Sequence, residues 1–529
     1  MCLASVVLSC AMTYPLIARL GRVGRVDTAD GRLSIWNVAW VARTLVVDPA
    51  HLFDANIFFP NRGTLAYSES NIGAGILALP AYWVTRGNPY VAINVAVLLA
   101  FSLSAIGMYY LVRHLTHDRR AAAIAAVLFA FCPHVLAHSA HIQLLMTAGL
   151  PFSMLAFHRL AEQPTAGRGA QLGLAVAAQA VSCGYYGVFL FLIVGFAVVV
   201  VAASRHWSRR AYWQALLVGG VVALLIVTPF FLPYLALRRD TGFARGMDEA
   251  GHYAADWRSY LASASYAHHW MLERLGHWNE VLFPGFIVTG LGVAGAWLTS
   301  RTSKELAIIY GGLVVLAFWT SFGPGAGLYT VLYHSLPVFS WLRAPARFGV
   351  VVVFGLSVLA GFGLAGFLPG HRKGTLATLL LIAAAIGELA LPFPVTTVQA
   401  LSPAYRVLSG LPRGPVIEMP FFFPEVGLFQ HTIYMLNSTS HWMPLVNGYS
   451  DYIPKDFRDH VETLKFFPSR DAFKLLEVDK VRYAVWHMYG YNAENRKDIL
   501  VRLTEFQRYL RPLYIDDETR LYEIVSFPP

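Results

Sequence analysis

The sequence predicts an α-helical protein that crosses a membrane many times and carries a small C-terminal α/β domain. Of its 529 residues, 56% are hydrophobic and only 14% are charged, whereas a soluble domain carries roughly 25% charged residues. The mean hydropathy is +0.50. The apolar residues come in long unbroken runs, and roughly 18 such residues in a helix span the hydrocarbon core of a bilayer.

The first apolar run, at about 3–20, lacks a basic segment before it and a clean cleavage site after it. We therefore expect it to be a retained helix and not a removed signal peptide. Ten further spans are expected, which makes eleven within a membrane domain of residues 1–391. They lie at about 91–112, 121–136, 142–157, 172–182, 186–203, 213–235, 281–297, 306–320, 348–367 and 376–391.

The short loops between these spans carry the basic residues and set the orientation. They are 113–120, 159–168, 205–210, 301–304 and 371–373. If the N-terminus is cytoplasmic, all five lie on the cytoplasmic side, as the positive-inside rule requires. The first loop (residues 21–90), the fourth loop (residues 238–280) and the tail (residues 392–529) are then extracytoplasmic.

The tail is predicted to be a soluble α/β domain. Strand-like runs at 414–420 and 481–486 alternate with helix-like runs at 456–466 and 495–510. The formal net charge of +10 reflects the basic loops, and no Lys/Arg stripe interleaved with aromatics indicates a nucleic-acid partner. The four cysteines form neither a disulfide framework nor a CxxC metal motif.

The first loop holds two apolar pieces, 33–47 and 72–84, which are short and suit helices lying at the membrane interface. Asp27 and Asp30 precede the first piece. Asp30 or Thr28 is expected to cap a helix that starts near Arg32. A carboxylate held at a helix start is also well placed to act as a base. Glu69 opens the second piece.

Five arginines expected on the outer side are candidates for binding a phosphate. Arg343 and Arg347 flank Pro345, which fits the first turn of the span at 348–367, so both guanidinium groups are expected near a helix N-terminus. The fourth loop adds Arg238, Arg239 and Arg245. The competing interpretation is that these arginines extend to lipid headgroups.

Polar residues in three other places are candidates for binding a substrate. His134 and His138 have the i, i+4 spacing of a metal pair, but no carboxylate accompanies them in their own loop. Hydrogen bonding of His141 and Gln143 to a sugar or phosphate is the preferred functional hypothesis. Tyr67 in the first loop, and His441 and Tyr449 in the tail, complete the expected substrate-binding set.

These features resemble the GT-C superfamily of membrane glycosyltransferases, which use polyprenyl-phosphate-linked sugars and include aminoarabinose and protein O-mannosyl transferases. The resemblance rests on the long first loop, with an Asp shortly after the first helix and two juxtamembrane helices. Short motifs extend it to a group of bacterial multi-pass proteins. These motifs are Asp30-x5-Trp36, Gly63-Thr-Leu-Ala-Tyr-Ser-Glu69, His141-Ile-Gln143 and Arg343-Ala-Pro-Ala-Arg-Phe348.

The resemblance implies a glycosyltransferase of the bacterial plasma membrane. It would move a hexosyl or pentosyl unit from a polyprenyl-phosphate carrier to an extracytoplasmic glycan, lipid or protein. Asp30 would be the general base, with Asp27 as the rival and Glu69 assisting. The adjacent acid pair of some relatives is absent, since Thr28 and Ala29 separate Asp27 from Asp30. No metal ligand is assigned, and use of Mg²⁺ or Mn²⁺ is left open.

Two other classes of function remain as alternatives. A lipid or solute transporter or flippase usually carries ionisable residues within its spans and shows repeated halves, whereas here the spans are almost free of charge and no halves match. A non-catalytic GT-C-like protein of glycan assembly, with the tail as a binding module, is kept open by the missing acid pair.

Overall fold

The computed structural model describes residues 2–367, 372–422 and 425–529. The chain forms two compact units. Unit 1 comprises residues up to 19, 71–77 and 94–394, and unit 2 comprises 20–70, 78–93 and 395–529. Helices α3 (Ile72–Val84) and α4 (Pro89–Thr116) contribute residues to both. His371, in the last of the basic loops, lies outside the described residues.

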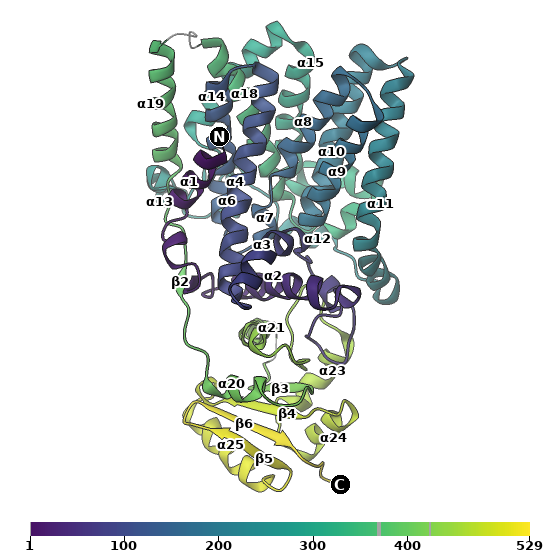
Figure 1. The fold of residues 1–529 in the computed structure, drawn as a ribbon, viewed down its shortest axis with the longest axis vertical. Coiled ribbons are helices and arrows are strands. Elements are labelled where there is room, and N and C mark those ends of the chain that lie inside the picture. Colours follow the sequence, from purple (N-terminus) through teal and green to yellow (C-terminus); the bar gives the residue numbers. More distant parts are fainter. Residues whose placement is uncertain (1, 368–371, 423–424) are drawn as a thin grey trace. The chain divides into compact units, whose positions relative to one another are not determined.

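Unit 1 is a bundle of helices (Figure 1). Besides parts of α3 and α4, it contains α1 (Cys2–Met12), α5 (Arg119–Ala130), α6 (Pro133–Ala137), α7 (Ile142–Leu145), α8 (Gly149–Glu162), α9 (Ala166–Ser182), α10 (Gly184–Val201), α11 (Arg210–Thr241), α12 (Met247–His252), α13 (His269–Leu275), α14 (Phe286–Thr302), α15 (Lys304–Leu306), α16 (Gly312–Ser321), α17 (Leu328–Ser335), α18 (Gly349–Phe367) and α19 (Arg372–Leu389).

Seven helices in the described part of the chain are long and apolar enough to cross a membrane. They are Pro89–Thr116, Arg119–Ala137, Ile142–Glu162, Gly184–His206, Arg210–Thr241, Lys304–Ser321 and Pro345–Phe367. Three shorter apolar helices accompany them, at Cys2–Met12, Ile72–Val84 and Gly374–Leu389. The predicted multi-span helical architecture is confirmed, whereas the number of eleven spans is not.

Glycines allow neighbouring helices of unit 1 to approach closely. A Cβ on Gly295 of α14 would lie 1.8 Å from the Leu359 carbonyl oxygen of α18, and one on Gly173 of α9 would lie 2.3 Å from the Gly219 carbonyl oxygen of α11. A larger residue would force these backbones apart. Small residues at helix contacts are the usual way in which membrane helices gain van der Waals packing.

Unit 2 combines the first loop with the tail. The loop supplies β1 (Val23–Gly24), which pairs with β2 (Thr396–Thr397), and α2 (Ala29–Val47). The tail adds α20 (Pro403–Ser409), β3 (Val416–Met419), α21 (Glu425–Leu428), α22 (His431–Asn437), α23 (Lys455–Leu464), α24 (Arg470–Val478), β4 (Tyr483–His487), α25 (Ala493–Glu505), β5 (Leu510–Ile515) and β6 (Thr519–Ile524).

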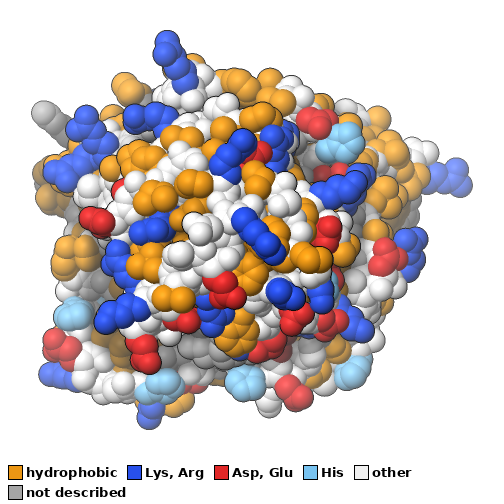
Figure 2. Space-filling model, turned by 90° about the horizontal axis from the view of Figure 1, so that it is seen from below, with side chains coloured by type: hydrophobic (Ala, Val, Ile, Leu, Met, Phe, Trp, Pro, Cys, Tyr) orange, Lys and Arg blue, Asp and Glu red, His pale blue; other side chains and the backbone are white. Residues whose placement is uncertain are grey.

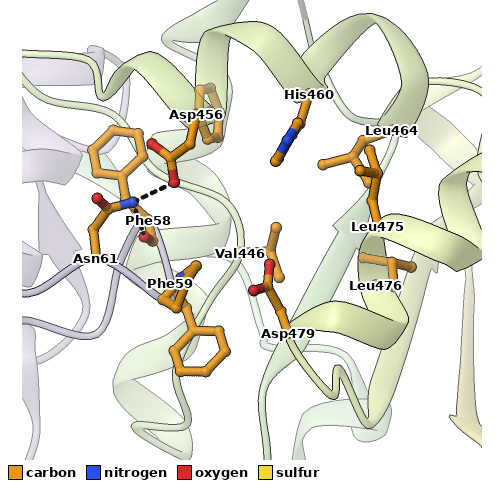
Figure 3. Close-up of a pocket in the computed structure, with 12 residues that line it drawn as sticks. Phe58, Phe59, Asn61, Val446, Asp456, His460, Leu464, Leu475, Leu476 and Asp479 are labelled. Atoms are coloured by element: carbon orange, nitrogen blue, oxygen red, sulfur yellow. Dashed lines mark hydrogen bonds between the residues drawn. The ribbon is translucent and has the colours of Figure 1, made fainter.

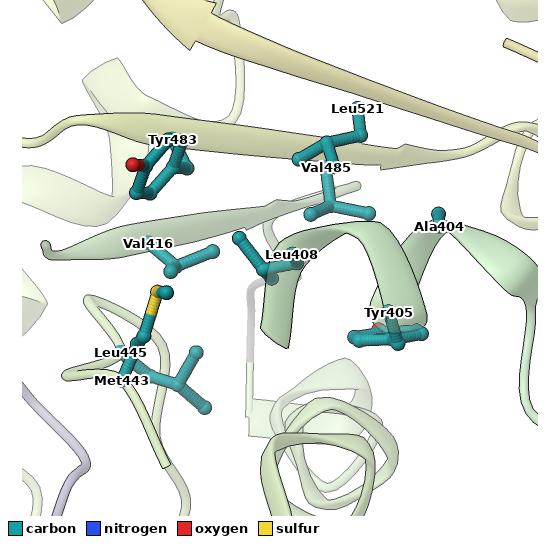
Figure 4. Packing of buried hydrophobic residues seen from close by; sticks show 9 residues of the cluster. All are labelled: Ala404, Tyr405, Leu408, Val416, Met443, Leu445, Tyr483, Val485 and Leu521. Carbon is teal, nitrogen blue, oxygen red and sulfur yellow. The ribbon is translucent and has the colours of Figure 1, made fainter. Parts of the chain in front are cut away.

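A four-stranded mixed sheet forms the core of the tail, in the order β3-β4-β6-β5. Strands β3 and β4 are parallel, and the other neighbours are antiparallel. Leu408 of α20 packs among Val416, Val485 and Leu521 of the sheet (Figure 4). The predicted strands are found as β3 and β4, and the predicted helices as α23 and α25.

The first loop is joined to the tail by hydrogen bonds between backbones and through Asn56. The Phe59 N–H donates to the Leu445 carbonyl at 2.8 Å, and the Phe58 N–H donates to the Asn447 carbonyl at 3.1 Å. The Asn56 side chain donates to the Met443 carbonyl at 3.0 Å. The loop segment therefore runs as an extra strand-like partner of the tail segment 443–447.

Candidate functional site

Helix α2 starts at Ala29, and its cap is Thr28. The Thr28 hydroxyl accepts a hydrogen bond from the Gly31 N–H at 3.1 Å. Of the two predicted caps Thr28 is therefore correct, and the predicted start near Arg32 is three residues late. Asp30 instead lies in the first turn of α2 and is half-buried. There the partial positive charge of the helix N-terminus stabilises an ionised carboxylate.

Asp27, the rival to Asp30, is paired with a neighbouring arginine. Its two carboxylate oxygens accept from Nε of Arg25 at 3.0 Å and from Nη2 of Arg25 at 3.3 Å. The chain folds tightly here, because a Cβ on Gly31 would lie 1.9 Å from the Arg25 carbonyl oxygen. Only glycine fits at position 31, and this fit brings Arg25 back against the start of α2.

Arg32 links the start of α2 to the tail. Its Nε donates to the Thr432 hydroxyl at 2.9 Å and its Nη1 to the Val26 carbonyl at 2.8 Å. Burial lowers the pKa of Arg32, and the nearby charge of Asp27 opposes that shift. The backbone that carries Asp27 and Asp30 is therefore held in place by a contact between two residues 400 positions apart in the sequence.

The two other predicted residues of the first loop have different surroundings. The Glu69 carbonyl accepts from the Asn37 side chain at 3.0 Å, and Glu69 lies three residues before α3 begins. Tyr67 is 8% exposed, and its ring packs edge-on against Tyr452 at 5.0 Å. Burial raises the pKa of Tyr67 to about 12. Its ring contributes to the packing of the loop against the tail.

In unit 1, Tyr185 contacts both Arg343 and Arg347. The Arg347 guanidinium lies over the Tyr185 ring, 4.2 Å from its centroid. The Tyr185 hydroxyl accepts from the backbone N–H of Arg343 at 2.9 Å. Pro345 begins the 3₁₀ turn Pro345–Phe348 that leads directly into α18, as the sequence predicts.

Glu249 of α12 brings a third arginine to this place. It accepts from Nη1 of Arg245 at 2.8 Å, and Nη1 of Arg343 lies 3.9 Å from the same carboxylate oxygen. Arg238 donates to the Ser340 hydroxyl at 2.9 Å, next to the chain that leads to Arg343. Arg239 differs, because its side chain is 79% exposed and paired with Asp240. Four of the five predicted arginines therefore lie on segments that contact one another. They are Arg238, Arg245, Arg343 and Arg347.

Glu280 supplies the carboxylate that the histidine loop lacks in sequence. Its Oε2 lies 3.5 Å from Nε2 of His138, and the Val281 carbonyl lies 3.2 Å from Nδ1 of His134. Burial tends to raise the pKa of Glu280, but the hydrogen bond to His138 and the charges of His138, His134 and Arg347 outweigh it and lower the pKa. The carboxylate beside these histidines therefore comes from the fourth loop and not from their own loop.

His141 and Gln143 lie at the short helix α7, beside this cluster. His141 precedes the helix, and its ring centroid lies 6.3 Å from that of His138. The side-chain oxygen of Gln143 is buried and has no hydrogen-bond partner among the described residues. An acceptor of this kind is available to a ligand hydroxyl.

An apolar groove lies next to the arginines in the same unit. It is lined by residues of α10, α16, α17 and the start of α18, and its empty space is about 610 Å³ when counted out to open solvent. Phe189 and Phe348, both in its wall, stack with ring centroids 3.9 Å apart. Phe348 directly follows Arg347 in the chain, so one residue of the groove wall is the sequence neighbour of an arginine of the charged cluster.

The predicted tail residues lie away from the strands. The His441 ring stacks on Tyr405, with centroids 6.0 Å apart, and its Nδ1 accepts from the Met443 N–H at 3.0 Å. Burial, assisted by Arg413, lowers the pKa of His441 to about 3. Tyr449 lies on the irregular segment that follows the first-loop contact.

Reasoning from the sequence missed Tyr185, Glu249 and Glu280. The two glutamates lie in or at the end of the fourth loop, and the mixture of acidic and basic residues in this long loop is the signal that could have indicated them. Among the residues that the structure describes, no group of three or more His, Cys, Asp or Glu is arranged to hold a metal ion.

The charges on the outside of the tail form no single-sign field on the face seen in Figure 2. Lys and Arg side chains alternate there with Asp and Glu and with scattered hydrophobic groups. This surface lacks the clustered positive charge expected of a nucleic-acid interface.

Comparison with solved structures identifies the fold. The chain is similar to the arabinofuranosyltransferase AftD from mycobacteria, with 15% identity and a TM-score of 0.56 over 99% of this chain and 41% of that one. It is also similar to the oligosaccharyltransferase of Archaeoglobus fulgidus, with 13% identity and a TM-score of 0.52 over 100% of this chain and 74% of that one. The chain thus spans less than half the length of AftD.

The apo structure of ArnT from Cupriavidus metallidurans shares 15% identity, covers 94% of both chains and has a TM-score of 0.47, too low to carry weight. No family model matches the sequence, and no curated protein matches it. The chain therefore has the fold that AftD and the Archaeoglobus fulgidus oligosaccharyltransferase share with it. The chain is a multi-pass membrane protein of that fold.

Proposed function

We propose that this protein is a membrane glycosyltransferase that moves a sugar from a polyprenyl-phosphate carrier to an extracytoplasmic acceptor. The observation that carries the proposal is an apolar groove in unit 1 with Phe348 in its wall, directly after the segment that bears Arg343 and Arg347. An isoprenoid phosphate has a long apolar chain with an anionic end. The groove offers apolar walls to the chain, and the arginines offer charge to the phosphate.

The arginines suit the leaving group of the reaction. When the acceptor oxygen bonds to the anomeric carbon, the bond from that carbon to the phosphate oxygen breaks, and the polyprenyl phosphate keeps the electron pair. The guanidinium groups of Arg343 and Arg347 stabilise this developing charge. In the absence of phosphate, Glu249 balances Arg245 and Arg343.

Asp30 is the proposed general base, which takes the proton of the acceptor hydroxyl. Its position in the first turn of α2 favours the ionised form that a base needs. Both oxygens of Asp27 accept hydrogen bonds from Arg25, and Asp27 is kept as the rival base. Glu69 is proposed to assist, and His141 and Gln143 to bind the sugar.

The base is tested with full-length protein and a panel of polyprenyl-phosphate-linked sugars. Asp30→Asn should reduce transfer by roughly a hundredfold or more, which is the usual contribution of a general base, with expression unchanged. Asp27→Asn is the matched control and should keep most activity. If Asp27→Asn alone abolishes transfer, the base is Asp27, and if neither variant loses activity, carboxylate catalysis from this loop is wrong.

The donor site is tested by binding alone. Decaprenyl phosphate should bind the protein more tightly than decaprenol, and Arg347→Gln should weaken only the phosphate form, by roughly tenfold. Arg239→Gln, at an exposed position in the last turn of α11, should change neither affinity. Equal binding of the phosphate and the alcohol would contradict the assignment of the arginines.

A further inference from the structure

A second pocket lies wholly within unit 2 and contains none of the residues proposed for catalysis. The first loop contributes its segment 58–61, and the tail contributes helices α23 and α24 (Figure 3). The pocket is shallow, with about 360 Å³ of empty space counted out to open solvent. Asp456, His460 and Asp479 surround its polar side (Figure 3).

The pocket offers hydrogen-bond acceptors and almost no donors. The Asn61 amide group donates one hydrogen to the Phe58 carbonyl at 2.9 Å and the other to Asp456 Oδ2 at 2.8 Å. Its two donors are therefore used, which leaves the amide oxygen. None of the twelve lining residues is Lys, Arg, Ser, Thr or Tyr, and only His460 carries another side-chain N–H. A ligand here must supply the donors.

The carboxylates of Asp456 and Asp479 disfavour the binding of an anion in this pocket. Burial raises the pKa of Asp479, the charge of His460 opposes the shift, and the charge of Asp456 adds to it. The charges of Asp456, His460 and Asp479 therefore interact across the pocket. A phosphate, sulfate or uronic acid would add a third negative charge, whereas a neutral polyol would donate hydrogen bonds to the carboxylates that are already there.

Aromatic residues line the pocket beside the carboxylates (Figure 3). The backbone of Phe58 is left-handed, with φ of 56°, which is rare for an aromatic residue and persists only where the surroundings enforce it. Its ring packs edge-on against Phe457 at 5.0 Å, and a Cβ on Gly448 would lie 2.7 Å from that ring. This conformation holds the half-buried Phe59 at the pocket.

We propose that this pocket binds one ring of a neutral saccharide, with its hydroxyls donating to Asp456 and Asp479 and its C–H face against Phe59. The flat C–H face of a sugar ring is attracted to the electron-rich face of an aromatic ring, and a few fixed polar groups then set its orientation. The proposal rests on the proposed function in one respect, because it makes the acceptor a glycan that the tail holds during transfer.

The test is direct binding of soluble oligosaccharides to the full-length protein in nanodiscs, by saturation-transfer NMR and calorimetry. The probes are neutral trisaccharides of mannose, galactose and arabinose, a uronic-acid trisaccharide and a glucosamine trisaccharide. We expect a neutral trisaccharide to bind and the uronic acid not to bind. Asp479→Asn and Phe59→Ala should each weaken that affinity by tenfold or more.

Asp471→Asn is the matched control, because this acid lies on the same helix α24 with its side chain 82% exposed, and it should not change the affinity. Thermal unfolding of each variant shows whether the fold is kept. Asp30→Asn should bind the saccharide normally while losing transfer, so failure of the base and failure of the pocket are distinguishable. Preferred binding of the glucosamine probe, unchanged affinity in both pocket variants or binding by no neutral probe would overturn the proposal.

Discussion

The guanidinium group of Arg347 lies 4.2 Å from the centroid of the Tyr185 ring, directly over its face. The same tyrosine accepts a hydrogen bond from the backbone of Arg343 through its hydroxyl. One side chain from the start of α10 therefore positions both arginines that precede α18. The energy of such a cation–π contact is about 0.5–2 kcal/mol, depending on how much water is excluded.

Substitution of Tyr185 should therefore weaken binding of decaprenyl phosphate in two steps. Tyr185→Phe keeps the ring and loses the acceptor for Arg343, so we expect a loss of up to about tenfold in affinity. Tyr185→Leu also loses the ring face and should cost more. Tyr186→Phe is the control, because its hydroxyl donates to the Leu144 carbonyl at 3.0 Å. Equal affinities in Tyr185→Leu and the wild type would show that the ring does not hold the arginines.

The charge of Glu280 should stabilise the fold at neutral pH and cease to do so in acid. The pKa of Glu280 is below its ordinary value of 4.5 in the folded protein, so the contribution is complete above that value and is lost as the pH falls through the folded pKa. We expect Glu280→Gln to melt at a lower temperature than the wild type at pH 7 and to converge with it in acid, once the pH has fallen below the lowered pKa of Glu280.

Glu273→Gln is the matched control for that experiment, since Glu273 lies in the same fourth loop with a side chain 69% exposed. It should change the melting temperature little at either pH. A constant difference between Glu280→Gln and the wild type at both pH values would contradict an effect of ionisation.

Loss of the Asn56 side chain should release the first loop from the tail. Its oxygen accepts from the Trp36 indole at 3.1 Å, and its nitrogen donates to Ser438 at 3.1 Å and to the Met443 carbonyl at 3.0 Å. Asn56→Ala leaves these buried groups without partners, at a cost of about 2–4 kcal/mol. Limited proteolysis should then cut the first loop faster, whereas Asn495→Ala, at an exposed position of α25, should leave the rate unchanged.

The tail should lose stability as the pH falls below 6.5, because His431 is buried as a neutral imidazole. Both amide hydrogens of Asn447 are used, for the Glu418 carbonyl and for Nδ1 of His431. The proton of His431 is therefore on Nε2, which donates to the Phe422 carbonyl at 3.2 Å. Burial lowers the pKa of His431 from 6.5 to about 4.

Between these two pKa values, His431 is therefore protonated in the unfolded tail but neutral in the folded tail. Stability is complete above pH 6.5 and falls by about 1.4 kcal/mol per unit down to about pH 4, or about 3 kcal/mol in all. Hydrogen exchange in β3 and β4, corrected for the intrinsic effect of pH, measures this. His431→Gln should flatten the dependence relative to the wild type, whereas the exposed His334→Gln should not.

Local patterns predicted much of the secondary structure. Both interfacial pieces of the first loop are helices, and the second has the predicted bounds, Ile72–Val84. The reason is that helix formation depends on runs of neighbouring residues, and turn residues such as Gly63, with φ of 67°, mark the ends. The cap of α2 was harder, because Thr28 and Asp30 are both good caps and backbone geometry alone selects between them.

The sequence by itself determined that the chain is a multi-span membrane protein with acids in a long first loop and arginines before α18. Those properties depend on runs of apolar residues and on short motifs, because hydrophobic burial and local hydrogen bonding act on residues that are close in the sequence. Only the tertiary structure decided which polar side chains meet: Arg32 with Thr432, His138 with Glu280, and Arg343 with Glu249. Such partners are far apart in the chain, and only the packing of helices and strands brings them within reach.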